Sequence, residues 1–489
     1  MVLHLYFNRF RLSSSDEILR IISGYPTLFW AVCLVFCGIK IQKKLQFLSW
    51  YIKKGFSIRE SESFVYSFFI MDFWKKKFII IWSGQLFSIL SSAIVGYSVM
   101  FWLSIETKSA EVLSYAVLAT LLPQALLGPI AGVYVDRWKR KLTMIAADSF
   151  VALCSLILGG LFYFDQAELG LIYLLMALRS IGNAFHSPAM QAAIPMLAPE
   201  SELMRIAGVN QALQSVSSIA GPALGALLIT SLNMTVVMLL DVAGAIIACT
   251  ALAFVAIPDP VRTEEKRKPG IWHEMVEGWK EVQKHRGLPW LMIISVAVTF
   301  FLMPVAVLFP LMTVTHFGGD TFQMSLVEIV WGTGTLLGGL ILGIWKIKIR
   351  RVGLINSSYL ALGSYILISG LLPSDAFVLF VCLTIIGGLA GSLVFGVSRQ
   401  GGSFYSGPFT SVLQTFIDHT ALGRVFSLFG SLSLLPSMIG ILLTGYIADT
   451  IGVSNAFWIS GCIILSLGVI SFFIPSIMKL EKRSGEDRF

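Results

Sequence analysis

Charged side chains are scarce in this sequence of 489 residues. Only 13% of its residues are Asp, Glu, Lys or Arg, whereas 56% are hydrophobic. An average soluble domain has about 25% charged residues, and so few charges could not cover the surface of a soluble protein. The composition therefore excludes an ordinary water-soluble protein and predicts that lipid is the main solvent of the folded chain.

Motifs for catalysis and metal binding are also missing. The sequence contains no HExxH, GxSxG or GxxxxGK[ST] pattern, and its six cysteines form no CxxC motif. Zinc proteases, serine hydrolases and nucleotide-driven pumps use these patterns, so we expect no enzyme, metal, cofactor or nucleotide. The net charge of +8 comes from short basic clusters between apolar runs, which indicates topology signals rather than a nucleic-acid surface.

What the sequence does contain is a series of apolar runs of roughly 20 residues, the length that a helix needs to cross a bilayer. They predict an all-α polytopic membrane protein with twelve transmembrane helices in two six-helix bundles. The spans are expected at residues 78–103, 110–135, 142–163, 168–195, 206–230, 234–257, 290–314, 322–345, 352–372, 376–398, 421–447 and 455–478. The expected domains are an extension (1–70), a first bundle (71–257), a basic loop (258–289), a second bundle (290–480) and a tail (481–489).

Basic residues occupy every second connection between these spans. The basic connections contain Lys75, Arg140, Arg205, Lys346 and Arg424. The other set of connections holds a single lysine, Lys108. Because Lys and Arg are retained on the cytoplasmic side, we expect both ends of the 71–489 core in the cytoplasm, in a bacterial cytoplasmic membrane.

The first 70 residues fit this pattern poorly. They offer one apolar stretch, residues 21–39, followed by a basic and polar run. A thirteenth span would place Arg9, Arg11 and Arg20 on the outer side, and an uncleaved signal-like segment is the second interpretation. We favour a third, in which translation begins at Met71, whose MDFWKKKF is an ordinary cytoplasmic start.

The second span ends in the sequence GVYVDRWKRK, which resembles a signature of the major facilitator superfamily. The residues that carry the resemblance are Gly132, Asp136, Arg137, Arg140 and Lys141. A glycine permits close helix approach, and an aspartate can bind a cation or a helix N-terminus in the other half of the protein. We therefore expect a conformational latch at this loop.

Two residues near the loop qualify that interpretation. Lys139 stands where the family usually has Gly, and Asp148, near the inner end of the third span, is expected to brace the loop. The alternative is a purely topogenic basic loop. That alternative explains Arg140 and Lys141 but requires neither Gly132 nor Asp136.

Three charged residues inside apolar spans are the candidates for transport and proton coupling. Arg179 is half-way along the fourth span, where an unpaired charge costs ~2.5–3.5 kcal/mol, so it should face a carboxylate or a polar cavity. With Gly182 it resembles the superfamily's helix-four motif. Asp241 and Glu328 are the candidate proton carriers, because burial favours the neutral form of a carboxyl group. A structural ion pair, or carboxylates hydrated at the outer interface, are the alternatives.

The fifth span contains a Gly-Pro-x-x-Gly sequence, formed by Gly221, Pro222 and Gly225. It resembles the signature of exporters in the superfamily, with Ala226 in place of the second of the usual paired glycines. Proline removes a backbone hydrogen bond, so the segment predicts a kink on which a bundle can rock. A plain packing kink is the alternative.

From Met71 to Lys482 the chain is similar to the macrolide-efflux branch of the superfamily, as in WSGQLFSILSSAI, RSIGNAFHSPA and LGRVFSLFGS. The resemblance implies a proton antiporter with alternating access that exports small hydrophobic compounds such as macrolides. Export of an endogenous metabolite such as a siderophore is the alternative, as is a non-transporting receptor or scaffold. The expected partners are substrate, protons and lipid, with a separate partner protein left open.

Overall fold

A computed structural model describes residues 58–197, 202–255, 271–344, 351–395, 408–418 and 421–486, together with 199 and 257. Its contacts divide the chain into two compact units, Met1–Trp74 and Lys75–Phe489. The second unit contains all twelve predicted spans. The apolar stretch at residues 21–39 lies outside the described residues.

The first six predicted spans are all helices. They are α5 (Ile58–Thr107), α6 (Ala110–Arg137), α7 (Arg140–Tyr163), α8 (Leu169–Leu197), α9 (Leu203–Ser231) and α10 (Met234–Ala253). Polar caps set the starts of two of them, because their first N–H groups have no partner within the helix. Ser109 Oγ accepts a hydrogen bond from Val112 N, and Asn233 Oδ1 accepts one from Val236 N.

The last six predicted spans are also helices. They are α12 (Leu288–Thr315), α13 (Thr321–Ile344), α14 (Arg351–Leu371), α15 (Phe377–Phe395), α17 (Leu422–Ile451) and α18 (Val453–Phe473). The predicted end of the last span at residue 478 is too late, since α18 ends at Phe473. Pro475 then opens a separate helix, as proline cannot continue a helix but suits its first turn.

Three short helices lie between or after the spans and were not predicted. They are α11 (Ile271–Gln283), α16 (Pro408–Phe416) and α19 (Pro475–Glu486). The helix α11 packs against α17, and Arg424 of α17 forms an ion pair with Glu277 of α11. The expected basic loop therefore contains a helix that is attached to the second half of the chain.

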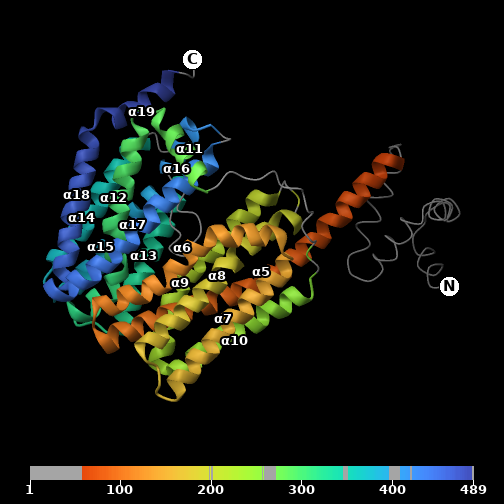
Figure 1. Cartoon of the computed structure of the whole chain (residues 1–489), viewed down its shortest axis with the longest axis horizontal. Helices are drawn as coiled ribbons and strands as arrows, with labels where there is room; N and C mark the ends of the chain where they lie inside the picture. The colour runs from red at the N-terminus through yellow and green to blue at the C-terminus, as the bar shows by residue number, and fades with distance from the viewer. Residues whose placement is uncertain are drawn as a thin grey trace, which may run out of the picture. The chain divides into compact units, whose positions relative to one another are not determined.

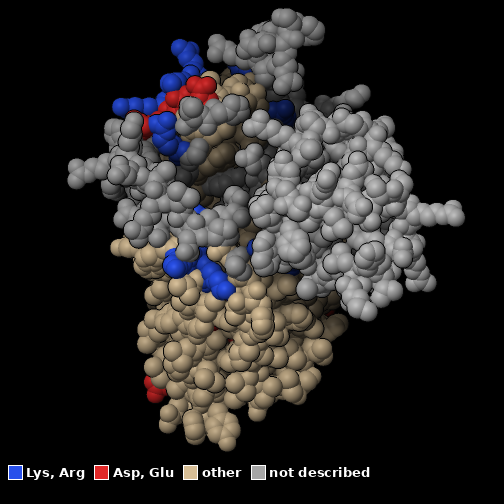
Figure 2. Space-filling model, turned by 90° about the vertical axis from the view of Figure 1, so that its right-hand side faces the viewer, with Lys and Arg blue, Asp and Glu red and all other residues tan. Residues whose placement is uncertain are grey.

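In the described part of the chain, ten helices are long and apolar enough to cross a membrane. Two shorter apolar helices, Val216–Ser231 and Phe377–Ser392, occupy the fifth and tenth predicted spans. Figure 2 shows a broad area almost without charged side chains, with Lys and Arg beyond one border of it. Large apolar side chains such as Leu126 and Phe473 are exposed, as lipid contact requires. The protein is thus a multi-pass, all-α membrane protein.

The helices gather into two groups, α5–α10 and α12–α18 (Figure 1). In the first group, α8 packs on α6 and α7, and α7 packs on α10. In the second group, α14 packs on α15 and α18, and α12 packs on α17 and α18. Contacts of α9 with α13, and of α6 with α17 and α12, join the groups. We call the groups the first and the second bundle.

The cores of the two bundles differ in chemistry. The second bundle has an aromatic core in which the ring of Phe309 lies 5.7 Å from Trp331, 6.1 Å from Phe380 and 5.4 Å from Phe457. Its buried polar contacts include the hydroxyl pair of Ser295 and Tyr359, 2.6 Å apart. Among the described residues, the buried charged side chains of the first bundle include Asp148, Arg179 and Asp241, and those of the second include Glu328.

Candidate functional site

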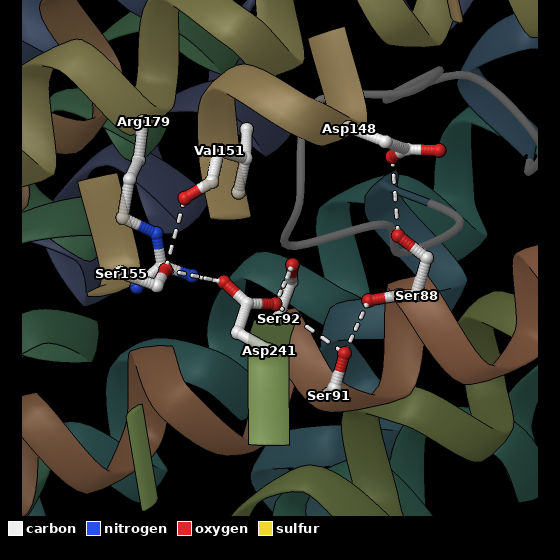
Figure 3. Close-up of polar contacts among 8 residues, drawn as sticks. All are labelled: Ser88, Ser91, Ser92, Asp148, Val151, Ser155, Arg179 and Asp241. Carbon is white, nitrogen blue, oxygen red and sulfur yellow. Dashed lines mark hydrogen bonds and ion pairs between the residues drawn. The ribbon is translucent and has the colours of Figure 1, made fainter. Parts of the chain in front are cut away.

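An ion pair lies inside the first bundle, between Arg179 of α8 and Asp241 of α10 (Figure 3). The distance from Arg179 Nη2 to Asp241 Oδ2 is 2.7 Å, and the two side chains are only 10% and 2% exposed. Neither charge would be tolerated alone in such surroundings, whereas the two together are. The structure thus supplies the carboxylate that the sequence predicted for Arg179.

Three serine hydroxyls complete the surroundings of Asp241. Ser92 and Ser91 of α5 donate to Oδ1 over 2.7 and 3.3 Å, and Ser155 of α7 donates to Oδ2 over 2.7 Å. Hydrogen bonds to an ionised acceptor are stronger than neutral ones. Asp241 therefore ties α10 to α5, α7 and α8 at a single point.

A glycine makes this convergence sterically possible. Gly244 lies one turn after Asp241 on α10, and a Cβ atom there would clash with Ser91 Oγ and lie 3.0 Å from the carbonyl oxygen of Phe87. The absence of a side chain lets α10 approach α5 closely enough for the serines to reach the carboxylate.

A second polar cluster lies next to the first, around Asp148 of α7. Its Oδ1 accepts a hydrogen bond from Ser88 over 3.1 Å and lies 3.4 Å from Nε2 of His186 on α8. Ser91, whose hydroxyl can donate either to Asp241 or to the backbone carbonyl of Ser88, lies one turn from Ser88 on α5 and so stands between the two clusters. Figure 3 shows both carboxylates with the connecting serines.

Sequence reasoning did not single out His186 or the serines. Serine is common in membrane helices, so these hydroxyls gave no signal alone. A signal was present in the spacing, because His186 follows Arg179 by seven residues and Ser155 follows Asp148 by seven. Seven residues are about two helical turns, so each pair lies on one face of its helix.

Glu328, the other predicted proton carrier, is buried on α13 in the second bundle. The partners of Asp241 all come from α5, α7 and α8. The two predicted carboxylates therefore lie in different bundles, and among the described residues Asp241 is the carboxylate that pairs with Arg179.

The predicted latch residues lie around the end of α6 and the start of α7. The structure describes only the helical backbone of three of them, Gly132, Asp136 and Arg137, which belong to α6. Arg140 is the first residue of α7, and Lys141 Nζ donates to the carbonyl groups of Ala253 and Val255, each over 2.9 Å. A cation at the C-terminal end of a helix stabilises its free carbonyl groups. Lys141 therefore caps α10 within the first bundle.

The Gly-Pro-x-x-Gly segment lies where α9 packs against α5. Helix α9 runs without interruption through Pro222. A Cβ atom on Gly221 would lie 3.1 Å from Ala93 Cβ, and one on Gly225 would lie 3.2 Å from the carbonyl oxygen of Ile94. Both glycines thus allow close packing of the two helices.

One contact between the bundles was not foreseen. Asp449, near the end of α17, accepts hydrogen bonds from the backbone N–H groups of Ala110 (2.6 Å) and Glu111 (3.0 Å) and from the hydroxyl of Ser109 (2.6 Å). A carboxylate of one bundle thus binds the N-terminus of a helix of the other. The sequence suggested this kind of interaction for Asp136, which lies at the opposite end of α6.

Comparisons with known proteins agree with this architecture. A family model described as the Major Facilitator Superfamily matches residues 81–400. Macrolide efflux protein A of Streptococcus pyogenes is 38% identical over 408 residues, which cover 83% of this chain and 98% of that protein. Multidrug efflux pump Tap of Mycobacterium tuberculosis is 26% identical over 395 residues, with 78% and 89% covered.

Solved structures show the same fold at low sequence identity. A bacterial homologue of the human lysosomal transporter Spinster, in an inward-facing and unoccupied conformation, superimposes with a TM-score of 0.61. It is 14% identical in sequence, and the match covers 84% of this chain and 98% of that one.

Proposed function

The chain belongs to the Major Facilitator Superfamily, and from this premise we propose that it exports macrolide-like drugs across the membrane in exchange for protons. It is a carrier rather than an enzyme, it lies in a lipid bilayer and it binds a small molecule. The direction of transport and the class of substrate are proposed from the two efflux relatives, of which the macrolide exporter is similar over most of the chain.

The proton is proposed on one observation, the buried pair of Arg179 and Asp241 inside the first bundle. A carrier without nucleotide chemistry must draw on an ion gradient, and a buried carboxylate that alternates between ionised and neutral forms can couple to protons. Glu328 in the second bundle is the other carboxyl group proposed for this role.

Protonation of Asp241 would change the balance inside the first bundle. The neutral carboxyl group no longer attracts Arg179, and removal of one partner of a buried pair typically costs about 3–5 kcal/mol. The hydrogen bonds from the serine hydroxyls would also weaken, because their acceptor would no longer carry a charge. Such a difference is large enough to favour a different arrangement of α5, α7, α8 and α10, and thus to link proton binding to conformation.

Contacts at the two ends of α6 suggest how this conformational change alternates. We propose that the Asp449 contact closes the end at Ala110, and that Asp136 closes the opposite end when the first contact is open. In this proposal the basic connections lie in the cytoplasm. The end of α6 that carries Asp136 lies on the same side. Pro222 serves as the flexible point of α9.

Transport into everted membrane vesicles tests the function. We expect vesicles with the wild-type protein to accumulate radiolabelled erythromycin when the interior is acidified, and to release it when an uncoupler is added. Asp241→Asn should abolish the accumulation, because the variant side chain cannot bind and release a proton. The matched control is Asp320→Asn, since Asp320 is an exposed cap at the start of α13 whose bond to Gln323 an asparagine can keep. Wild-type accumulation that survives the uncoupler would exclude proton antiport.

A further inference from the structure

We infer that His186 and Asp148 form a second proton-binding site, which passes protons between Asp241 and the end of the first bundle that carries the basic connections. The inference rests on the proposed proton antiport and assigns it a route. The two residues lie on α8 and α7, and neither is needed for the Arg179–Asp241 pair itself.

The geometry of the two side chains suits a proton site. His186 Nε2 lies 3.4 Å from Asp148 Oδ1, and the side chains are 12% and 7% exposed. Histidine binds and releases protons near neutral pH, and a buried imidazolium requires an adjacent carboxylate. Uptake of one proton at Nε2 therefore turns a neutral histidine beside a carboxylate into an ion pair, with no net charge left behind.

Buried polar atoms near the pair also support a proton site. Among the residues that the structure describes, neither amide atom of Gln85 nor Oδ2 of Asp148 has a hydrogen-bond partner, although all are buried. Gln85 lies one turn before Ser88 on the same face of α5, and Ser88 donates to Asp148. More than about 90% of buried polar groups are bonded, so such a group of unused atoms calls for an explanation. A site whose hydrogen bonds change with each proton taken up needs spare donors and acceptors.

The position of the pair connects it with Asp241. Asp148 lies two turns from Ser155 along α7, and His186 lies two turns from Arg179 along α8, a separation of ~10 Å at 1.5 Å per residue. Ser91 donates to Asp241, and Ser88 donates to Asp148, so one hydroxyl stands at each carboxylate. The two hydroxyls lie one turn apart on a single face of α5, where a bridging water would complete a path between the sites.

The proton balance is simple. Asp241 gives up its proton and, as a carboxylate, pairs again with Arg179. The proton passes along the face of α5 that carries Ser91 and Ser88, with water bridging the hydroxyls, to Nε2 of His186, which becomes an imidazolium paired with Asp148. His186 then releases the proton to water at the basic end of the bundle, and the site returns to its starting state.

Among the described residues, the groups in printed contact with the pair carry no full charge, and the basic residues Arg140 and Lys141 lie about two turns from Asp148 at the start of α7. From α5 it meets Ser88, with Gln85 one turn away. From α10 the thiol of Cys249 interacts electrostatically with Asp148 and lies 3.8 Å from Ser149 Oγ. In the other direction along α7 and α8, the charged residues Arg179 and Asp241 lie about two turns away.

Two transport modes of the reconstituted protein separate a proton route from a structural role. Counterflow, the exchange of radiolabelled for unlabelled erythromycin at equal pH, requires binding and conformational change but no net proton transfer. Transport driven by a pH gradient requires binding, conformational change and net proton transfer. We expect His186→Gln and Asp148→Asn to keep wild-type counterflow while the gradient-driven rate falls by roughly 100-fold, the lower end of what a positioned proton-transfer group contributes.

Two further variants sharpen the comparison. Ser88→Ala removes one hydroxyl with little risk to folding, and we expect the same selective loss at smaller magnitude. His316→Gln is the matched control, because His316 is bonded to the backbone carbonyl of Leu372 in the second bundle, and both rates should stay at wild-type level.

Each outcome decides between the two proposals. Wild-type transport that ignores the pH gradient would overturn the proposed proton antiport itself. If the pH gradient drives transport by the wild type and by the His186, Asp148 and Ser88 variants at equal rates, proton antiport is supported and the second proton-binding site is excluded. Loss of counterflow in all three variants would show that the pair only holds the bundle together, and this would also overturn the inference.

Discussion

A single carboxylate, Asp241, holds the centre of the first bundle, and it does so through four donors on three helices. Charges inside apolar spans are conspicuous in a sequence, so Arg179 and Asp241 could both be predicted as functional candidates. Their direct pairing could not, because Glu328 and Asp148 were equally available as partners of an arginine. The serines and His186 could not be predicted individually, since only the packing of four helices gives them meaning.

The first prediction concerns the energetics of this pair. Arg179→Ala and Asp241→Ala should each lower the melting temperature of the purified protein strongly, because each leaves a buried charge without its partner, at a cost of about 3–5 kcal/mol. The double variant should be more stable than the sum of the single effects implies, as no unpaired charge remains. Thermal unfolding in detergent measures all three. Strictly additive effects would show that the two charges do not interact.

At the scale of helices, the close approach of α10 to α5 is what brings the serines to Asp241. Glycines at helix contacts could be recognised in the sequence only where they formed a known motif, as Gly221 and Gly225 did. Gly244 belongs to no such motif, and its importance follows from its contact with Ser91.

We therefore expect Gly244→Ala to reduce both stability and transport. The new methyl group would clash with Ser91 and press on the backbone at Phe87, and such overpacking typically costs about 1–3 kcal/mol. Gly160→Ala on α7 is the control, because a Cβ atom there meets nothing within 4 Å and alanine favours a helix. Thermal unfolding and erythromycin efflux should separate the two variants, and equal behaviour would contradict the close approach.

The contact between α17 and α6 yields another prediction at this scale. Asp449→Ala removes three hydrogen bonds from the start of α6. Loss of a helix cap costs about 1 kcal/mol, so the fraction of molecules whose bundles are separated at this end should rise roughly fivefold. Asp449→Asn should have a smaller effect, because asparagine is also a good cap. Distances between spin labels at Glu106 and Ile451, both exposed, would report the opening. A distance distribution unchanged by Asp449→Ala would show that the contact does not hold the bundles.

At the scale of the whole molecule, the apolar runs and alternating basic connections were sufficient to predict the fold class and the twelve spans. Long apolar segments are unambiguous, because the bilayer permits little besides helices. The short helices α11, α16 and α19 could not be predicted in this way. Helices of this length are marginal in isolation and depend on packing, as α11 does on α17 through Glu277 and Arg424.

The most direct test of the account is whether drug and proton movements are linked in the purified protein. In proteoliposomes that contain a pH-sensitive dye, an outward gradient of erythromycin should drive protons inward, and an imposed pH gradient should drive erythromycin uphill. Asp241→Asn should abolish both movements, whereas Asp320→Asn should leave both at the wild-type level. Erythromycin movement with no accompanying proton flux in the wild-type protein would contradict the account.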